Sequence, residues 1–156
     1  MTRTTNRRHL LALCALLALC VFRLAAPVSA EEADGVVVLV NARNPTQTLT
    51  NAEVSKMFLG QTAFWHGVVP VKVVLRPDGS VAAKSFYETA LGMTPQAFRK
   101  HWDEVQLSGR GVAPKPLATP EEVASAVASM PGGIGYALAS EAWKLNHKGV
   151  KIIQLR

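Results

Sequence analysis

Cysteine is scarce in this chain: its two cysteines, Cys14 and Cys20, both lie among the first thirty residues. Residues 31–156 therefore offer neither a disulfide nor a thiol nucleophile. A secreted domain without disulfides has to obtain its stability from a hydrophobic core. A stretch of 126 residues is long enough for one domain with such a core, but too short for two full lobes.

A long hydrophobic run is also absent. The longest one, residues 9–22, stops at Arg23 after roughly fourteen residues, whereas a membrane-spanning helix needs about 20. Basic residues precede this run and the small residues 28–30 follow it, an order typical of a cleaved signal peptide. The basic residues are Arg3, Arg7 and Arg8. We expect cleavage before Glu31, which leaves residues 31–156 as a single periplasmic domain.

Two other interpretations of residues 1–30 stay open. The segment could be a membrane anchor, or the signal of a lipoprotein attached through Cys14 or Cys20. A leucine precedes each cysteine, however, where a lipobox prefers glycine or alanine. The pair Arg7-Arg8, followed by two leucines, also allows twin-arginine export, and the sequence does not separate this route from the general one.

A strong positive charge is missing from the remainder. The whole chain has a net charge of +6, but four of its 17 basic residues lie in residues 1–30. Their removal leaves 13 basic residues against 11 acidic ones, a net charge of +2. The high isoelectric point near 9.7 therefore comes largely from the signal peptide, and it does not indicate nucleic-acid binding.

Apolar segments alternate with capped helical segments along residues 31–156. Residues 35–40 form a continuous apolar, β-branched run, which is typical of a strand buried on both faces and predicts a parallel sheet covered by helices. Further strands are predicted at 71–75, 132–136 and 150–155. Helices are predicted from the capping boxes at 50–53 and 119–122, from Ser80, from Thr94-Pro95 and near 140–145. This alternation predicts an α/β layered fold.

Motifs of catalysis are absent as well. No Gly-x-Ser-x-Gly elbow occurs, and the acidic neighbours Asp103 and Glu104 would point in different directions on a helix. The histidines of residues 31–156 show no metal-ligand spacing; they are His66, His101 and His147. The tryptophans are spread along the chain and are expected to pack in the core; they are Trp65, Trp102 and Trp143. We therefore expect that the protein is not an enzyme and that it binds neither a metal ion nor a cofactor.

The segment 75–80, Leu-Arg-Pro-Asp-Gly-Ser, joins a predicted strand to a predicted helix. The first N–H groups of a helix lack internal partners and its dipole is positive there, so the turn favours an anion. Arg76 would add a forked cation and Ser80 a hydroxyl donor, with Gly79 allowing close approach through a positive φ. The alternative is that Ser80 only caps the helix and Arg76 is a surface side chain.

Two other glycine-containing segments have weaker signals. In the segment 107–111, Ser108, Gly109, Arg110 and Gly111 could donate to a ligand from close range, or they could form a solvated loop. The segment 131–136, Pro-Gly-Gly-Ile-Gly-Tyr, lacks the Lys-Ser/Thr pair of a phosphate-cradling loop. We interpret it as a structural turn into a strand that buries Tyr136.

Several segments in this order resemble one family. They are Asn41, 49–54 (Leu-Thr-Asn-Ala-Glu-Val), 57–61 (Met-Phe-Leu-Gly-Gln), Phe64-Trp65, 71–73 (Val-Lys-Val), 76–80 and 131–136. Over roughly residues 36–139 the chain resembles the phosphate-binding component of bacterial phosphate ABC transporters, in a short single-module form. The resemblance implies a periplasmic-binding-protein-like α/β fold that holds phosphate through helix N-termini and an arginine.

The resemblance also implies which residues would bind. In full-length receptors the Arg-x-Asp-Gly-Ser stretch continues Gly-Thr, and its Arg, Ser, Gly and Thr contact the anion. Here Arg76, Gly79 and Ser80 match, whereas Val81 and Ala82 stand in place of Gly and Thr. The backbone N–H groups of Val81 and Ala82 remain, and one hydroxyl donor is lost.

The sequence thus predicts a periplasmic oxyanion-binding protein, phosphate being the leading ligand, that serves transport or sensing and has an inner-membrane ABC permease as a possible partner. The residues expected to bind are Arg76, Gly79, Ser80 and Val81, with Ser108, Gly109, Arg110 and Gly111 closing the site. The alternative is a periplasmic interaction or sensory subunit that keeps the fold and binds no anion. Convergence of Arg76, Ser80 and Arg110 on one concave spot would favour binding. We also expect Arg76→Ala to leave stability nearly unchanged.

Overall fold

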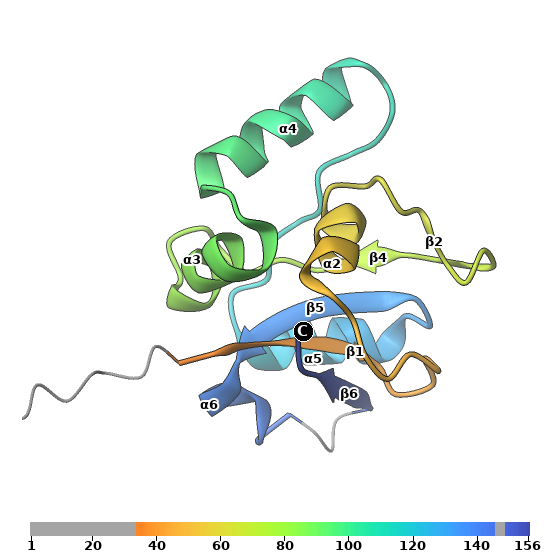
Figure 1. Ribbon diagram of the computed structural model, residues 1–156, viewed down its shortest axis with the longest axis vertical. Helices are drawn as coiled ribbons and strands as arrows, with labels where there is room; N and C mark the ends of the chain where they lie inside the picture. The colour runs from red at the N-terminus through yellow and green to blue at the C-terminus, as the bar shows by residue number, and fades with distance from the viewer. Residues whose placement is uncertain (1–33, 146–148) are drawn as a thin grey trace, which may run out of the picture. The chain divides into compact units, whose positions relative to one another are not determined.

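Strand β1 (Val36–Asn41) lies inside a four-stranded sheet of order β4-β5-β1-β6 (Figure 1). The computed structural model describes residues 34–145 and 149–156, so the predictions for residues 1–30 and for His147 lie outside the described residues. The other strands of this sheet are β4 (Lys72–Val73), β5 (Gly133–Leu138) and β6 (Val150–Ile153). A separate hairpin pairs β2 (Phe64–Trp65) with β3 (Val69–Pro70).

The prediction of a parallel sheet is wrong for β1. This strand runs antiparallel to both of its neighbours, with Val38 opposite Tyr136 on β5 and Ile153 on β6. Within this sheet only the short pairing of β4 with β5 is parallel among the described strands. The prediction that this strand is buried on both faces is confirmed. Burial on both faces requires helices on both sides of the sheet, and it does not depend on strand direction.

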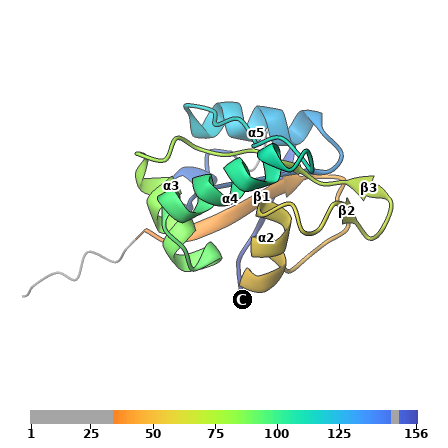
Figure 2. The ribbon, with the colours of Figure 1, turned by 90° about the horizontal axis from the view of Figure 1, so that it is seen from above.

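Helices cover both faces of the sheet, which confirms the α/β class. Figure 2 shows α5 (Pro120–Ser129) on one side, and α2 (Asn51–Phe58) and α3 (Val81–Phe86) on the other. Alternate residues of β1 therefore enter two cores. Val38 and Val40 pack with the first cluster, which includes Phe58, Phe86 and Tyr136. Leu39 packs with the second, which includes Val123 and Val127.

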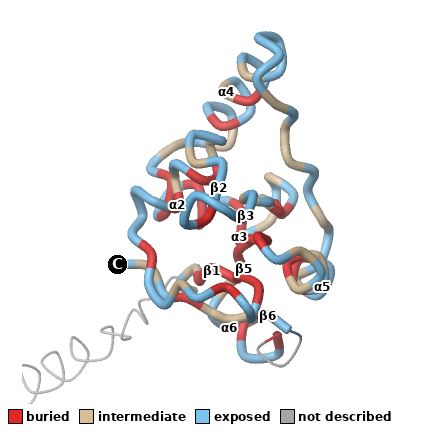
Figure 3. Tube along the Cα trace, turned by 90° about the vertical axis from the view of Figure 1, so that its right-hand side faces the viewer, coloured by how far each residue is buried: buried red, intermediate tan, exposed pale blue. Residues whose placement is uncertain are grey.

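The predicted helix starts are confirmed by their caps. Thr50 and Thr119 each form the predicted capping box with the glutamate three residues later. Ser80 caps α3, which continues as a π-helix, η2 (Tyr87–Leu91), and Thr94 caps α4 (Pro95–Leu107). The short helix near the C-terminus is α6 (Ala139–Ala142). In Figure 3 the tube is buried along much of β1 and β5, whereas α4 is largely exposed.

The glycines of segment 131–136 are needed for close packing, in agreement with a structural turn. A Cβ atom on Gly132 would lie 1.9 Å from the carbonyl oxygen of Pro70, and one on Gly135 would lie 2.7 Å from a methyl group of Val123. A side chain at either position would force the backbone or the α5 helix to move. The segment brings β5 against β4 and α5 and leads directly to Tyr136, which is fully buried as predicted.

One of the three tryptophans does not lie in the core. Trp65 and Trp102 are buried as expected, but Trp143 is 71% exposed. Trp143 is the C-terminal cap of α6, which has only four residues and leaves the ring at the surface. The ammonium group of Lys144 lies 5.3 Å from the centroid of this ring, so a cation covers part of it.

Candidate functional site

Arg76 leaves the sheet at the point where β4 has ended. The N–H of Val74 still donates to Ile134 on β5 at 2.8 Å, and the next residue, Leu75, forms an isolated bridge with Pro116. The backbone N–H of Arg76 then donates to the hydroxyl of Tyr136 at 3.1 Å. The residue is only 8% exposed, so the alternative of a surface arginine is wrong. Its backbone is fixed by the buried strand β5 and by the isolated bridge at the preceding residue.

The guanidinium of Arg76 forms an ion pair with Glu141 of α6. The distance from Nη1 to Oε2 of Glu141 is 3.3 Å, and the Glu141 side chain is 25% exposed. The same Oε2 atom accepts the backbone N–H of Leu138 at 3.1 Å. The Nε atom of Arg76 is buried and has no hydrogen-bond partner among the described residues. This arginine is therefore buried, charged and only partly paired.

Tyr136 supports this arginine from below. Its ring stacks on Phe86 with centroids 4.0 Å apart and planes 4° from parallel. Burial raises the pKa of its phenol to about 12, while the hydrogen bond from the Arg76 backbone and the Arg76 charge oppose that rise. The phenol is accordingly neutral near neutral pH and accepts the Arg76 N–H. The position of Arg76 is thus fixed jointly by the end of β4 and by the Tyr136 side chain in the core.

The N-terminus of α3 follows within four residues. The N–H of Ser80 donates to the carbonyl of Pro77 at 2.8 Å, and its hydroxyl oxygen accepts the N–H of Ala83 at 3.1 Å. Ser80 is therefore a helix cap, as one alternative held. Val81, the next residue, is 69% exposed. Gly79 does not have the positive φ expected for it, and a Cβ atom there would meet nothing within 4 Å.

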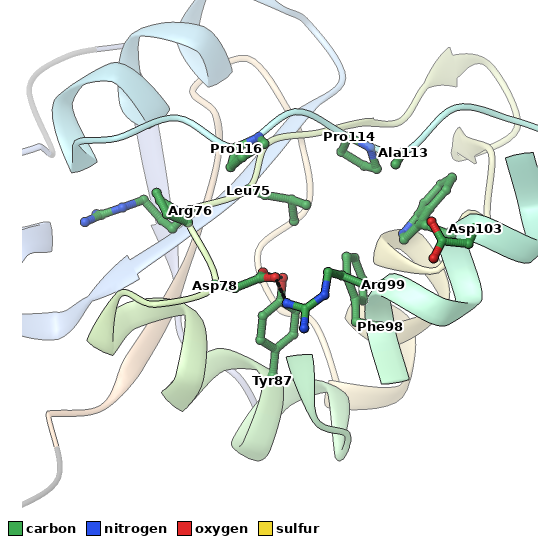
Figure 4. Close-up of a pocket in the computed structure, with 12 residues that line it drawn as sticks. Leu75, Arg76, Asp78, Tyr87, Phe98, Arg99, Asp103, Ala113, Pro114 and Pro116 are labelled. Atoms are coloured by element: carbon green, nitrogen blue, oxygen red, sulfur yellow. Dashed lines mark hydrogen bonds and ion pairs between the residues drawn. The ribbon is translucent and has the colours of Figure 1, made fainter. Parts of the chain in front are cut away.

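A cavity of about 430 Å³ lies on the other side of the same turn. Asp78 points into it and forms an ion pair with Arg99 of α4, while its other oxygen accepts the hydroxyl proton of Tyr87 at 3.0 Å. Figure 4 shows the Arg76 side chain pointing away from the Asp78–Arg99 pair. Arg76 therefore lines this cavity without directing its charge into it.

The segment 108–111 lies beside a different cavity. Arg110 and Gly111 line a space of about 340 Å³ together with His101 and Gln61. The Nε of Arg110 donates to the hydroxyl of Ser108 at 2.9 Å, and Gly109 has a φ of 69°. Ser80 lines neither this cavity nor the larger one. The structure brings Arg76 near the Ser80 turn, but it does not bring Arg110 to the same concave spot.

The comparisons with known proteins agree with this fold. The profile of the family described as a PBP superfamily domain matches residues 33–153. The chain belongs to this superfamily. No curated protein matches the chain.

Solved structures similar to this chain come from phosphate ABC transporters. An ABC-type phosphate transport receptor from Vibrio cholerae superposes with a TM-score of 0.58 and 22% identity, and the match covers 78% of this chain and 46% of that one. A phosphate ABC transporter substrate-binding protein from Clostridium perfringens, with bound phosphate, gives 0.60 and 21%, over 78% and 45% of the two chains. PstS from Borrelia burgdorferi gives 0.59 and 15%, over 79% and 47%.

These likenesses show that the PBP-superfamily chain has the fold of phosphate-binding proteins. It spans about half the length of the solved structures that it matches, since 45–47% of each of them is covered. The resemblance inferred from the sequence segments is thereby confirmed at the level of family and fold.

Sequence reasoning missed the partner of Arg76 in this PBP-superfamily domain. Glu141 lies 65 residues away from Arg76 in the chain, and its helix has Leu138 at the N-cap where a serine, threonine or aspartate would have given a signal. Sequence reasoning also did not predict the ion pair between Asp78 and Arg99, because this pair depends on how α4 turns back toward the end of β4. A long-range contact of this kind leaves no local pattern.

Two further properties bear on what this domain can do. Within residues 34–145 and 149–156, no three His, Cys, Asp or Glu side chains are grouped in a way that could hold a metal ion. None of the helices in the same ranges is both long enough and apolar enough to cross a bilayer.

Proposed function

We propose that this chain is a periplasmic protein that binds an inorganic oxyanion, phosphate being the leading ligand, and catalyses no reaction. The proposed binding residues are Arg76, Gly79, Ser80 and Val81, at the turn where β4 gives way to α3. Members with this fold include a phosphate ABC transporter substrate-binding protein solved with bound phosphate. Transport or sensing of phosphate, with an inner-membrane ABC permease as partner, is the role that this relationship supports.

One observation carries the proposal: Arg76 is buried, charged and incompletely paired. Only Nη1 contacts Glu141, at 3.3 Å and 3.5 Å from the two carboxylate oxygens, while Nε has no partner among the described residues. Leaving a donor of a buried charged group unsatisfied costs free energy, at least about 1–3 kcal/mol. An oxyanion with several acceptor atoms would satisfy that donor, and the backbone N–H groups that begin α3 lack helical partners of their own.

Glu141 is the competitor in this arrangement. Its carboxylate already neutralises Arg76, so an added anion would meet a like charge close by. Binding would therefore be weaker than an isolated arginine suggests, and it would improve if Glu141 lost its charge. This makes Glu141 the most informative position for a test.

The segment Ser108, Gly109, Arg110 and Gly111 stays in the proposal as a group that contacts the anion from the other side. It lines a different cavity from Arg76, and the two cavities share Trp102. The segment would have to move to meet an anion at Arg76. The Arg110 side chain is exposed and can reorient, whereas the backbone of the segment is hydrogen-bonded to the last turn of α4.

A second candidate is a periplasmic interaction or sensory subunit that keeps the fold and binds no anion. The Arg76–Glu141 pair favours this candidate, because it already provides Arg76 with a counter-charge. In that case Arg76 serves only to join β4 to α6.

Calorimetric titration of the purified protein with phosphate, and separately with sulfate, decides between the two candidates. For oxyanion binding we expect Glu141→Gln to tighten binding about threefold to tenfold, since a charge-assisted contact is worth about 1.5–3 kcal/mol and part of it is regained. Arg76→Ala should abolish most of the affinity. Ser80→Ala should weaken binding about fivefold and lower stability by about 1 kcal/mol, because it removes a cap.

The control is Glu104→Gln, which removes the same charge at an exposed position of α4. It should leave the affinity unchanged. If the parent and Glu141→Gln both fail to bind phosphate or sulfate at millimolar concentration, the interaction subunit replaces the binding protein. If the parent binds but Arg76→Ala binds equally well, the anion lies elsewhere.

A further inference from the structure

The cavity of about 430 Å³ beside Asp78 has a composition that does not suit an anion. It lies between α4, the end of β4 and the segment 113–116, and its size falls within the range of about 300–1,000 Å³ that small-molecule sites occupy. Figure 4 shows Pro114 and Pro116 along one side of the view, and Tyr87 and Phe98 along the other. The phosphate proposal leaves this cavity without a role.

The aromatic side of the cavity is continuous. The ring centroids of Tyr87 and Phe98 lie 5.0 Å apart, and those of Phe98 and Trp102 lie 6.4 Å apart in an edge-on arrangement. All three rings are almost completely buried, so their positions are set by the core rather than by solvent. Such a surface can accept a flat apolar group.

The charged side chains that line the cavity are Arg76, Asp78, Arg99 and Asp103, and without Arg76 they carry one net negative charge. Arg76 directs its guanidinium away from the cavity and toward Glu141. Arg99 is neutralised by Asp78, whose second oxygen accepts from Tyr87. Asp103 remains, and it is the lining side chain with a full charge that takes part in no ion pair among the described residues.

We propose that this cavity binds a small organic ammonium compound that carries one ring. The ring would pack between the prolines and the aromatic side, and the ammonium group would lie near Asp103. An aromatic carboxylate would instead have to compete with Asp78 for Arg99 and would meet the unpaired Asp103. This function is separate from oxyanion binding, and neither depends on the other.

Three probes that share a phenethyl group test the charge that the cavity prefers. They are phenethylamine, the neutral phenethyl alcohol and the anionic hydrocinnamate, each titrated calorimetrically into the purified protein. We expect phenethylamine to bind about threefold to fivefold more tightly than phenethyl alcohol, since the cation gains the contact with the Asp103 carboxylate. Hydrocinnamate should bind more weakly than the alcohol.

Asp103→Asn and its neighbour Glu104→Gln form a matched pair of variants. Both remove one exposed negative charge from α4, but only Asp103 lines the cavity. Asp103→Asn should weaken phenethylamine binding about threefold to fivefold, the range for an exposed ion pair, and should leave phenethyl alcohol unaffected. Glu104→Gln should change neither.

Four results would overturn the proposal. They are equal binding of the amine and the alcohol, tighter binding of hydrocinnamate than of the amine, equal losses in the two variants, and no amine binding at millimolar concentration. Phosphate titrated into the same samples keeps the two functions apart. Loss of phosphate binding with intact amine binding overturns only the oxyanion proposal, and the reverse overturns only this one.

Discussion

Two arginine-containing segments of this molecule, 76–80 and 108–111, lie in opposite environments. Arg76 is 8% exposed, donates its backbone N–H to Tyr136 and pairs with Glu141. Arg110 is exposed, and its Nε donates only to Ser108 two residues earlier. Both segments contain an arginine, a serine and glycine, so local composition does not account for the difference.

The difference follows from what comes before each segment. Arg76 follows β4, an edge strand that is held in the sheet by its pairing with the buried strand β5, and β5 also supplies Tyr136 beneath it. Arg110 follows the last turn of α4, where Leu107 is 88% exposed. An arginine is buried in this domain where the backbone is fixed by long-range contacts, and is solvated where only helix-end geometry holds it.

The largest expected effect comes from removing the buried ring beneath Arg76. Tyr136→Ala should lower the free energy of unfolding by about 4 kcal/mol, because truncation of a large buried aromatic side chain costs about 3–5 kcal/mol. The ring stacks on Phe86 and also contacts Phe58, so the cavity would open in the larger core. Chemical denaturation measures the change. Tyr136→Phe is the control and should cost only about 1 kcal/mol, the value of one hydrogen bond. An unchanged denaturation midpoint in Tyr136→Ala would show that the ring does not support this region.

An alkaline titration tests the same support without a mutation. The chain has two tyrosines, Tyr87 and Tyr136, and burial raises the pKa of both phenols above the ordinary value. A group whose folded pKa is raised stabilises the fold below its unfolded pKa, and this contribution is lost as the pH rises toward the folded value. For Tyr136, with a folded pKa of about 12 against an ordinary value of about 10, the loss reaches about 3 kcal/mol across that window.

The measurement is tyrosinate absorbance followed together with circular dichroism. We expect neither phenol to ionise near pH 10 while the fold is intact, and we expect ionisation to coincide with unfolding at higher pH. A tyrosine that titrates near its ordinary pKa in the folded protein would contradict the buried environment of that residue.

Much of the fold could be predicted from local patterns. The capping boxes at Thr50 and Thr119, the cap at Ser80 and the strand of residues 35–40 each leave a signature within a few residues. Strand direction leaves no such local signature, because the same apolar run is compatible with a parallel or an antiparallel neighbouring strand. β1 pairs with β5 and β6, which lie some 100 residues later in the chain, and no local feature of β1 indicates this pairing.

The candidate site was predicted less completely than the fold. The turn from β4 to Ser80 could be identified because strand, Pro-Asp-Gly and helix cap follow one another directly in the chain. The charge balance at that turn could not be predicted, because Arg76 pairs with Glu141 and Asp78 pairs with Arg99, and both partners lie in distant segments. Ion pairs between distant segments are fixed only when the helices that carry them are placed.

The buried ion pair predicts a loss of stability where the sequence, with Arg76 taken as a surface residue, predicted almost no change. Arg76→Ala should destabilise the protein by about 2 kcal/mol, because it leaves the carboxylate of Glu141 without its counter-charge. The value lies below the about 3–5 kcal/mol typical of fully buried pairs, since the Glu141 side chain is 25% exposed. Thermal and chemical denaturation at neutral pH test this. The double variant Arg76→Met with Glu141→Gln should recover part of the loss, and equal destabilisation of the single and double variants would contradict the ion-pair explanation.

The smallest effect is expected at the other arginine and completes the comparison. Arg110→Ala should change the free energy of unfolding by no more than about 0.5 kcal/mol, as for most exposed substitutions. Its side chain makes one described hydrogen bond, to Ser108, and takes part in no ion pair among residues 34–145 and 149–156. Chemical denaturation beside Arg76→Ala provides the measurement, with both variants removing the same positive charge. A loss of more than about 1 kcal/mol in Arg110→Ala would mean that the segment 108–111 is anchored as firmly as the turn after β4, and that the hydrogen bond from the Arg76 backbone to the Tyr136 hydroxyl does not explain the contrast.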